Sequence, residues 1–147
     1  MVFLNISICT DGASRGNPGD SASGFQIYDE SGKVIAKKEI YNGIKTNNYA
    51  EYNAIINALL WCIDNTDFSN TEITLYSDSK LVVSQINGLY KIKSPEMMEL
   101  NIKVKNLVKK LKSVKFINKP REFECIAKVD HAINLFLDKI ELDKKNR

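Results

Sequence analysis

The sequence predicts a single α/β domain in which strands and helices follow the order βββαβααβα. Short apolar stretches with a period of two come first, and longer stretches with helical spacing of apolar residues follow. No repeat, linker or low-complexity segment divides the 147 residues. A chain of this length can bury a stable core without disulfides or structural metal ions. We therefore expect one domain over residues 1–147, with a frayed basic tail at about 142–147.

Three strands are expected near the N-terminus. Residues 2–9 alternate in polarity up to Cys9, and the glycine-rich stretch DGASRGNPG, which begins at Asp11, follows closely. Residues 22–29 and 33–41 predict two more strands, joined by a turn at Ser31-Gly32. Asp11 is thus expected at the end of the first strand of a three-stranded meander.

Helices and two short strands make up the rest of the predicted domain. Residues 46–65 predict a helix that Thr46 or Asn47 can cap, with a small-residue face formed by Ala50, Ala54 and Ala58. Downstream we expect, in order, a strand at 72–78, a helix at 79–88, a helix at 94–112, a strand at 114–119 and a helix at 126–140.

The charge is unevenly distributed along the chain. Residues 80–121 contain eleven Lys or Arg and two acids, a balance of +9, while the other residues carry 10 bases and 16 acids. A one-sided basic segment suits a polyanion such as a nucleic acid. Because no apolar run approaches a membrane span and no signal-peptide pattern opens the chain, we expect a cytoplasmic, monomeric protein with no membrane association and no obligate protein partner.

The three cysteines, Cys9, Cys62 and Cys125, show no spacing typical of a metal site or a disulfide framework. They are expected to be small apolar side chains in or near the core, without a disulfide.

Four acids stand at the edges of predicted elements: Asp11, Glu51, Asp78 and Asp130. If the first and fourth strands are neighbours, Asp11 and Asp78 come out side by side at one carboxyl edge of the sheet, where open α/β sheets build their sites. Glu51 reaches them if its helix packs closely on the sheet. Because crowded carboxylates repel one another without a cation, the set suits two Mg²⁺ ions, for which Mn²⁺ can substitute.

The stretches TDGASRGNPG, TNNYAEYNAIINAL and LYSDSKLVVSQING resemble the signatures of type 1 ribonuclease H, in the same order and at about the same spacing. The resemblance implies a ribonuclease H-like fold, a five-stranded mixed sheet whose first three strands are antiparallel and which helices flank on both faces. It also implies a metal-dependent endonuclease that cleaves the RNA strand of RNA/DNA hybrids.

The resemblance carries the family's site residues onto this chain. The catalytic, metal-binding carboxylates fall on Asp11, Glu51, Asp78 and Asp130. Contacts with the hybrid fall on Gly12, Ser14, Asn17, Asn47 and Asn48, and Thr46 matches the start of a phosphate-binding pocket. The chain lacks the basic protrusion of some members, and the stretch GLYKIKS resembles the shorter form, in which Tyr90, Lys91 and Lys93 would contact the DNA strand; Tyr90 can equally be a core aromatic.

The approach to Asp130 departs from the family pattern. The stretch FECIAKVD is longer by two residues, and Ile126 stands where the family has an asparagine. A loop histidine that would move protons has no counterpart, because His131 adjoins Asp130 and points about 100° away from it on a helix. Glu122 or Glu124 can serve instead.

The mechanism predicted for this set is two-metal hydrolysis that leaves 5′-phosphate and 3′-hydroxyl ends. Two alternatives remain at this stage. One is a DNA-cutting nuclease of the same superfamily, which the hybrid-reading stretches GNPG and TNN disfavour. The other is a non-catalytic hybrid-binding module, which only the irregular last motif supports.

Overall fold

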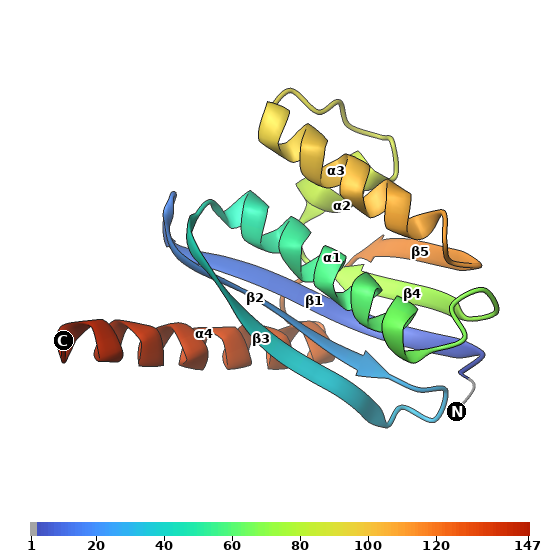
Figure 1. Ribbon diagram of the computed structural model, residues 1–147, viewed down its shortest axis with the longest axis horizontal. Helices are drawn as coiled ribbons and strands as arrows, with labels where there is room; N and C mark the ends of the chain where they lie inside the picture. The colour runs from blue at the N-terminus through green and yellow to red at the C-terminus, as the bar shows by residue number, and fades with distance from the viewer. Residues whose placement is uncertain (1–2) are drawn as a thin grey trace.

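A five-stranded sheet forms the centre of the computed structural model, which describes residues 3–147 (Figure 1). Its strand order is β3-β2-β1-β4-β5, with antiparallel pairing among the first three strands and parallel pairing of β1 with β4 and of β4 with β5. The strands are β1 (Asn5–Gly16), β2 (Gly19–Tyr28), β3 (Val34–Lys45), β4 (Glu72–Ser77) and β5 (Ser113–Asn118). The predicted element order and the mixed sheet are confirmed.

Helices cover both faces of the sheet, as predicted. They are α1 (Asn47–Asn65), α2 (Lys80–Ile86), α3 (Pro95–Val108) and α4 (Glu124–Lys145). Alternation along β1 separates two apolar clusters: Ile8 packs with α1, whereas Cys9 packs with α4 on the other face. In Figure 1, α1 and α4 lie on opposite sides of the strands. Within residues 3–147, none of the helices is long and apolar enough to cross a membrane.

The first strand is longer than the sequence pattern predicts. It continues through the glycine-rich stretch to Gly16 and pairs with β2 throughout, from Ser7 opposite Tyr28 to Gly16 opposite Gly19. The expectation that Asp11 ends the strand is therefore wrong: Asp11 lies inside β1, opposite Gly24. Strand β4, which pairs with the other side of β1, ends at Ser77, close to Asp11.

The C-terminal tail is helical rather than frayed. Helix α4 runs to Lys145, and Lys144 near its end forms an ion pair with Asp20 of β2. Earlier in the same helix, Asp138 and Glu141 pair with Arg15 of β1, each at 2.9 Å. These contacts with the β1–β2 hairpin hold the last turns, so the predicted fraying at about 142–147 is wrong as far as Lys145.

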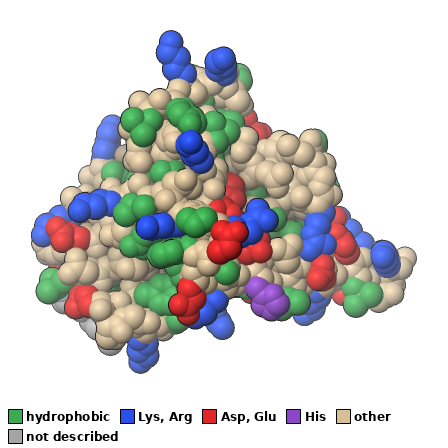
Figure 2. All heavy atoms as spheres, turned by 180° about the vertical axis from the view of Figure 1, so that it is seen from behind, with side chains coloured by type: hydrophobic (Ala, Val, Ile, Leu, Met, Phe, Trp, Pro, Cys, Tyr) green, Lys and Arg blue, Asp and Glu red, His purple; other side chains and the backbone are tan. Residues whose placement is uncertain are grey.

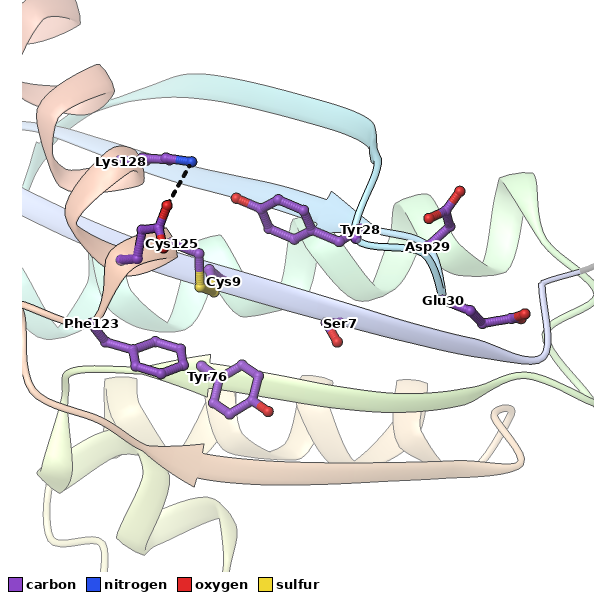
Figure 3. A pocket seen from close by; sticks show the side chains of 11 residues that line it. Ser7, Cys9, Tyr28, Asp29, Glu30, Tyr76, Phe123, Cys125 and Lys128 are labelled. Carbon is purple, nitrogen blue, oxygen red and sulfur yellow. Dashed lines mark ion pairs between the residues drawn. A yellow bond between two sulfur atoms is a disulfide. The ribbon is translucent and has the colours of Figure 1, made fainter.

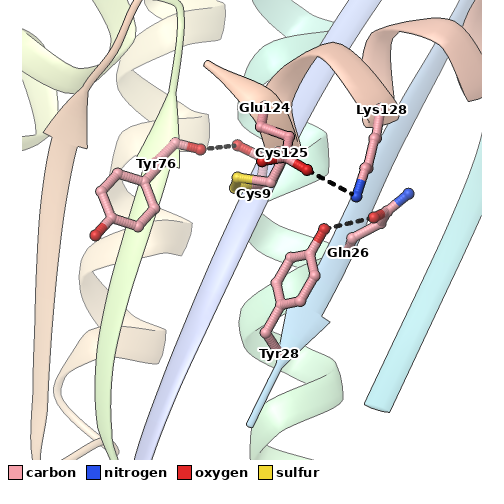
Figure 4. The surroundings of a disulfide bond; sticks show 8 residues. Cys9, Gln26, Tyr28, Tyr76, Glu124, Cys125 and Lys128 are labelled. Atoms are coloured by element: carbon pink, nitrogen blue, oxygen red, sulfur yellow. Dashed lines mark hydrogen bonds and ion pairs between the residues drawn. A yellow bond between two sulfur atoms is a disulfide. The ribbon is translucent and has the colours of Figure 1, made fainter. Parts of the chain in front are cut away.

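A disulfide joins Cys9 of β1 to Cys125 in the first turn of α4, with their Cα atoms 5.8 Å apart (Figure 4). The expectation of three unpaired cysteines is therefore wrong for this pair. The two residues are 116 positions apart in the chain, and only the packing of α4 on β1 brings them together. Cys62, by contrast, is a free, buried cysteine in the main core, as expected.

Candidate active site

Three carboxylates converge beside the end of β4. Ligand atoms of Asp11, Glu51 and Asp78 all lie within 4.8 Å of one another. The parallel register explains the first pair: Cys9 lies opposite Tyr76, so Asp11 of β1 and Asp78, just past the end of β4, are each two residues further on and lie side by side. This juxtaposition was predicted from the strand order. In the space-filling view from behind, acidic side chains gather near the middle of the face, with basic side chains beside them (Figure 2).

Gly12 lets Glu51 join this pair. A Cβ atom on Gly12 would lie 2.3 Å from the backbone carbon of Ala50 and 2.5 Å from the nitrogen of Glu51, so α1 approaches β1 too closely for any side chain at position 12. The Gly12 N–H donates to Glu51 Oε1 at 3.2 Å and to Asp11 Oδ1 at 3.0 Å. Ser23 of β2 fixes the same turn of α1 by donating to the Ala50 carbonyl at 2.6 Å.

The electrostatics of the three carboxylates favour a cation. Burial raises the pKa of Asp11 above its ordinary value, and the charges of Glu51 and Asp78 raise it further. Burial likewise raises the pKa of Glu51, with a further contribution from Asp78. Asp11 Oδ2 is buried without a hydrogen-bond partner among the described residues. Clustered oxygen ligands with one orphaned acceptor fit a hard divalent cation such as Mg²⁺.

Asp130 lines a cleft together with Glu51 and Asp78, but it lies outside the compact group of three carboxylates. It projects from the second turn of α4 into a cleft of about 350 Å³ and is close enough to Asp11 to contribute to the raised pKa of that carboxyl. The cleft is lined by Gly12, Ala13, Asn47, Asn48, Glu51, Asp78, Ser79, Arg121, Asp130 and Asn134. The structure thus brings all four predicted carboxylates to one site, despite the irregular approach to the last.

Sequence reasoning missed four lining residues, Ala13, Ser79, Arg121 and Asn134, and the last two bond to the carboxylates. Arg121 points into the cleft, with Nε 3.3 Å from Asp78 Oδ2, and this hydrogen bond raises the pKa of the guanidinium. Asn134 donates to the Asp130 carboxylate from one turn further along α4. The stretch Pro120-Arg121-Glu122 could have indicated Arg121, whereas no sequence signal marks Asn134.

The predicted hybrid-contacting residues meet at the tip of the β1–β2 hairpin and the start of α1. The Ser14 N–H donates to Asn47 Oδ1 at 2.8 Å, and the Asn47 N–H donates to Asn17 Oδ1 at 3.1 Å. Thr46 caps α1, its hydroxyl accepting from the Tyr49 N–H at 3.1 Å. These residues form one surface beside the cleft, to which Asn47 and Asn48 contribute directly.

Tyr90, Lys91 and Lys93 lie on the loop 87–94 between α2 and α3. All three are exposed, and Tyr90 is held through its backbone N–H, which donates to the Ser84 carbonyl at 3.2 Å. The core reading of Tyr90 is therefore wrong, and its ring is available at the surface.

The two candidate proton-transfer residues lie outside the cleft. Glu122 is exposed on the loop before α4, and Glu124 forms an ion pair with Lys128 at 3.3 Å. Glu124 instead lines a different hollow, of about 510 Å³, beside the disulfide. Figure 3 shows this hollow, with the rings of Tyr28, Tyr76 and Phe123 around it. His131, next to Asp130, is exposed and does not line the cleft.

Comparison with known sequences gives a consistent set of relatives. A family model described as "Reverse transcriptase-like" matches residues 9–129. A ribonuclease H of Acetivibrio thermocellus is 33% identical, with 96% of each chain covered. A bifunctional protein of Mycobacterium tuberculosis is 33% identical over 119 residues, which cover 80% of this chain and 32% of that protein. The chain thus spans about a third of the length of the mycobacterial proteins that it matches.

Solved structures show the same fold. The RNase H1 of the archaeon Halobacterium salinarum superimposes with a TM-score of 0.85 at 31% identity, covering 92% of this chain and 98% of that one. LC11-RNase H1, solved in complex with an RNA/DNA hybrid, superimposes with a TM-score of 0.78 at 34% identity, covering 90% and 99%. The five-stranded sheet and its flanking helices are therefore shared with proteins of known structure.

Proposed function

Because the chain belongs to the ribonuclease H family, we propose that it is an endonuclease that hydrolyses the RNA strand of RNA/DNA hybrids with the help of Mg²⁺. The observation that carries this proposal is the group of Asp11, Glu51 and Asp78 beside the end of β4, two of them buried, whose ligand atoms lie within 4.8 Å of one another. The hybrid as substrate is supported by the solved complex of the relative LC11-RNase H1.

In this proposal Asp11, Glu51, Asp78 and Asp130 hold two Mg²⁺ ions, for which Mn²⁺ can substitute. Metal ions bound there would supply activation of water and stabilisation of the leaving 3′ oxygen, which accounts for 5′-phosphate and 3′-hydroxyl products. The protein's part is to keep the carboxylates fixed. Gly12 does so through its N–H, which bonds to both Asp11 and Glu51, and through the close approach of α1 that it permits.

The chain's polar groups beside the cleft would recognise the hybrid. The 2′-hydroxyl distinguishes the RNA strand and is displayed in a shallow minor groove, so short donors and acceptors can reach it without reading bases. Asn17, Asn47 and Asn48 offer such groups at the hairpin tip and the start of α1. The basic segment 80–121, which includes the exposed Lys91 and Lys93, would contact phosphates of the DNA strand.

The non-catalytic alternative is disfavoured by the free energy that it costs to bury carboxylates close together. A binding module needs no buried Asp11 with an unpartnered oxygen, because hydrogen bonds and lysines suffice to bind a backbone. The cytoplasmic location and the monomeric state remain predictions. Sedimentation of the purified chain tests the second of these.

Hybrid cleavage by the purified chain tests the proposal. With Mg²⁺ we expect cuts in the RNA strand of a labelled RNA/DNA hybrid, and with excess chelator or with duplex DNA we expect none. Asp78→Asn should lower turnover by at least about 100-fold, since it removes a charge that holds the metal. It should keep the fold by circular dichroism. Substantial Mg²⁺-dependent cleavage by Asp78→Asn would rule out the carboxylate site.

A further inference from the structure

We infer that Asn134 is a positioning residue that fixes the carboxylate of Asp130, and that Arg15 holds Asn134 in the orientation this requires. The inference rests on the proposed function, in which Asp130 is the metal ligand contributed by α4. It assigns a role to two residues that lie outside the four carboxylates.

Asn134 bonds to Asp130 twice. Its Nδ2 donates to the Asp130 carbonyl at 2.9 Å and to Asp130 Oδ1 at 3.2 Å, across one turn of α4. The bond to the backbone fixes the amide relative to the helix, and the second bond ties the carboxylate to that fixed amide. The Asp130 side chain at the edge of the cleft thereby gains a defined orientation.

Arg15 determines which way the amide faces. Its Nη2 donates to Asn134 Oδ1 at 3.2 Å and to the Asn134 carbonyl at 3.1 Å. A guanidinium can only donate, so the amide oxygen must face Arg15 and the amide nitrogen must face Asp130. The opposite amide orientation would set two donors against each other and two acceptors against each other.

Arg15 is itself held firmly. Asp138 and Glu141 of α4 each pair with the guanidinium at 2.9 Å, and only 29% of the Arg15 side chain is exposed. These bonds join the end of β1 to the C-terminal half of α4. Because Ser14, the preceding residue, bonds to Asn47 at the start of α1, the same strand end joins the proposed hybrid surface to the Asp130 network.

Helix stability does not explain an asparagine at position 134. Asparagine is a poor helix former, because its side chain competes with the backbone for hydrogen bonds, and leucine or alanine would suit the middle of α4 better. Asn134 also lines the cleft, so its amide lies where Asp130 must be oriented. Partners that orient a metal ligand typically change metal affinity or activity by roughly 10- to 100-fold when removed.

The test compares Asn134→Leu with wild type by two measurements. Calorimetric titration with Mn²⁺ alone should show at least one site weakened by roughly 10-fold, and steady-state hybrid cleavage should show a similarly lower kcat with KM for the hybrid within about 2-fold. Lys139→Leu is the matched control, because Lys139 is exposed on the same helix and lies outside the cleft. It should leave both measurements at wild-type values.

A double-mutant cycle separates positioning from a merely structural role. In an Asp130→Asn background, adding Asn134→Leu should lower kcat no further, because the carboxylate to be positioned is already gone. An equal further loss in that background overturns the inference. So does wild-type Mn²⁺ affinity in Asn134→Leu.

Arg15→Lys gives a second, milder variant in case Asn134→Leu folds poorly. It keeps the positive charge but loses the planar fork, so we expect a smaller loss of Mn²⁺ affinity in the same direction. Unchanged Mn²⁺ affinity in Arg15→Lys contradicts the role of Arg15.

The Mn²⁺ titration also distinguishes the two proposals. A wild-type chain that binds Mn²⁺ but cuts no hybrid refutes the proposed function. The effect of Asn134→Leu on Mn²⁺ binding still decides the inference in that case.

Discussion

Asp11 and Glu51 are the buried carboxylates of the proposed metal site, and their burial has a measurable consequence. Two buried carboxyls next to Asp78 hold protons more tightly than the same groups in the unfolded chain, as their raised pKa values show. Bound metal favours the deprotonated forms, so protons and metal compete for the same oxygens. The metal-free protein is thus expected to differ strongly from the metal-bound one in its response to pH.

The stability of the metal-free protein should fall as pH rises. Groups whose folded pKa is raised contribute stability that is complete below their unfolded pKa values, 3.8 for Asp11 and 4.5 for Glu51, and that is lost as pH rises towards the folded values. Thermal melts in chelator from about pH 5 to about pH 8 should therefore show a decreasing Tm. Asp11→Asn should flatten this dependence, and a pH-independent Tm in wild type would contradict the raised values.

Gly12→Ala should damage both packing and site. The added Cβ would meet the backbone of Ala50 and Glu51 at 2.3–2.6 Å, so α1 must move away from β1. We expect a loss of about 2–4 kcal/mol in the free energy of unfolding, measured in urea, and a strongly reduced turnover. Gly43→Ala controls for the loss of a glycine elsewhere in the sheet. Gly43 has a φ of +79° with open space around it, so it loses stability through backbone strain while the cleft stays intact.

Sequence reasoning located the carboxylates because their positions follow from strand order. Asp11 and Asp78 come at matching places along neighbouring parallel strands, which short-range patterns and one topological assumption suffice to predict. Gly12 was expected only as a contact with the hybrid, and the structure shows that it also lets α1 approach β1. Asn134 went unnoticed, because its bonds depend on side-chain directions that no sequence period encodes.

At the scale of elements, the two largest departures concern β1 and α4. Strand β1 runs through the glycine-rich stretch because β2 supplies a hydrogen-bonding partner as far as Gly19. Helix α4 extends to Lys145 because its last turns contact the same hairpin through Arg15 and Asp20. Each element is lengthened by contacts with residues distant in the chain, and local propensity cannot predict such contacts.

The loop 87–94 is an element whose role can be tested by charge reversal. Lys91→Glu together with Lys93→Glu should weaken hybrid binding and reduce its salt dependence, since each lost phosphate contact lowers the log–log slope by roughly 0.9 for a duplex. Hybrid affinity would be measured across a salt series without divalent metal. The same reversal at Lys37 and Lys38, exposed on β3, is the matched control and should change the slope less. Equal slopes for the two double variants would show that the loop lysines only face solvent.

At the scale of the whole molecule, the two faces of the sheet are secured differently. The face under α1 is filled by the larger apolar cluster, which includes Ile8, Tyr52, Leu59 and Leu75. The face under α4 relies on a smaller cluster with four fully covered helix residues, Ile126, Val129, Ile133 and Leu137. Helix α4 also lacks a side-chain cap at its start, because Phe123 occupies the capping position before Glu124. The Cys9–Cys125 disulfide links this uncapped start of α4 covalently to β1.

Breaking the disulfide should lower stability more than activity. It closes most of the chain into one loop, because its cysteines are 116 positions apart, and such links typically contribute about 2–4 kcal/mol. A dithiol reductant should therefore lower the Tm of oxidised wild type, and Cys125→Ser should melt at the lower temperature with or without reductant. Cys62→Ala, which removes the free buried thiol, should stay sensitive to reductant.

Activity should change little when the disulfide is broken. Because the four buried residues of α4 keep Asp130 beside the cleft, kcat at about 25 °C should change by less than about 3-fold. A wild-type Tm that ignores the reductant, with three titratable thiols in the unfolded chain, would show that the link does not form.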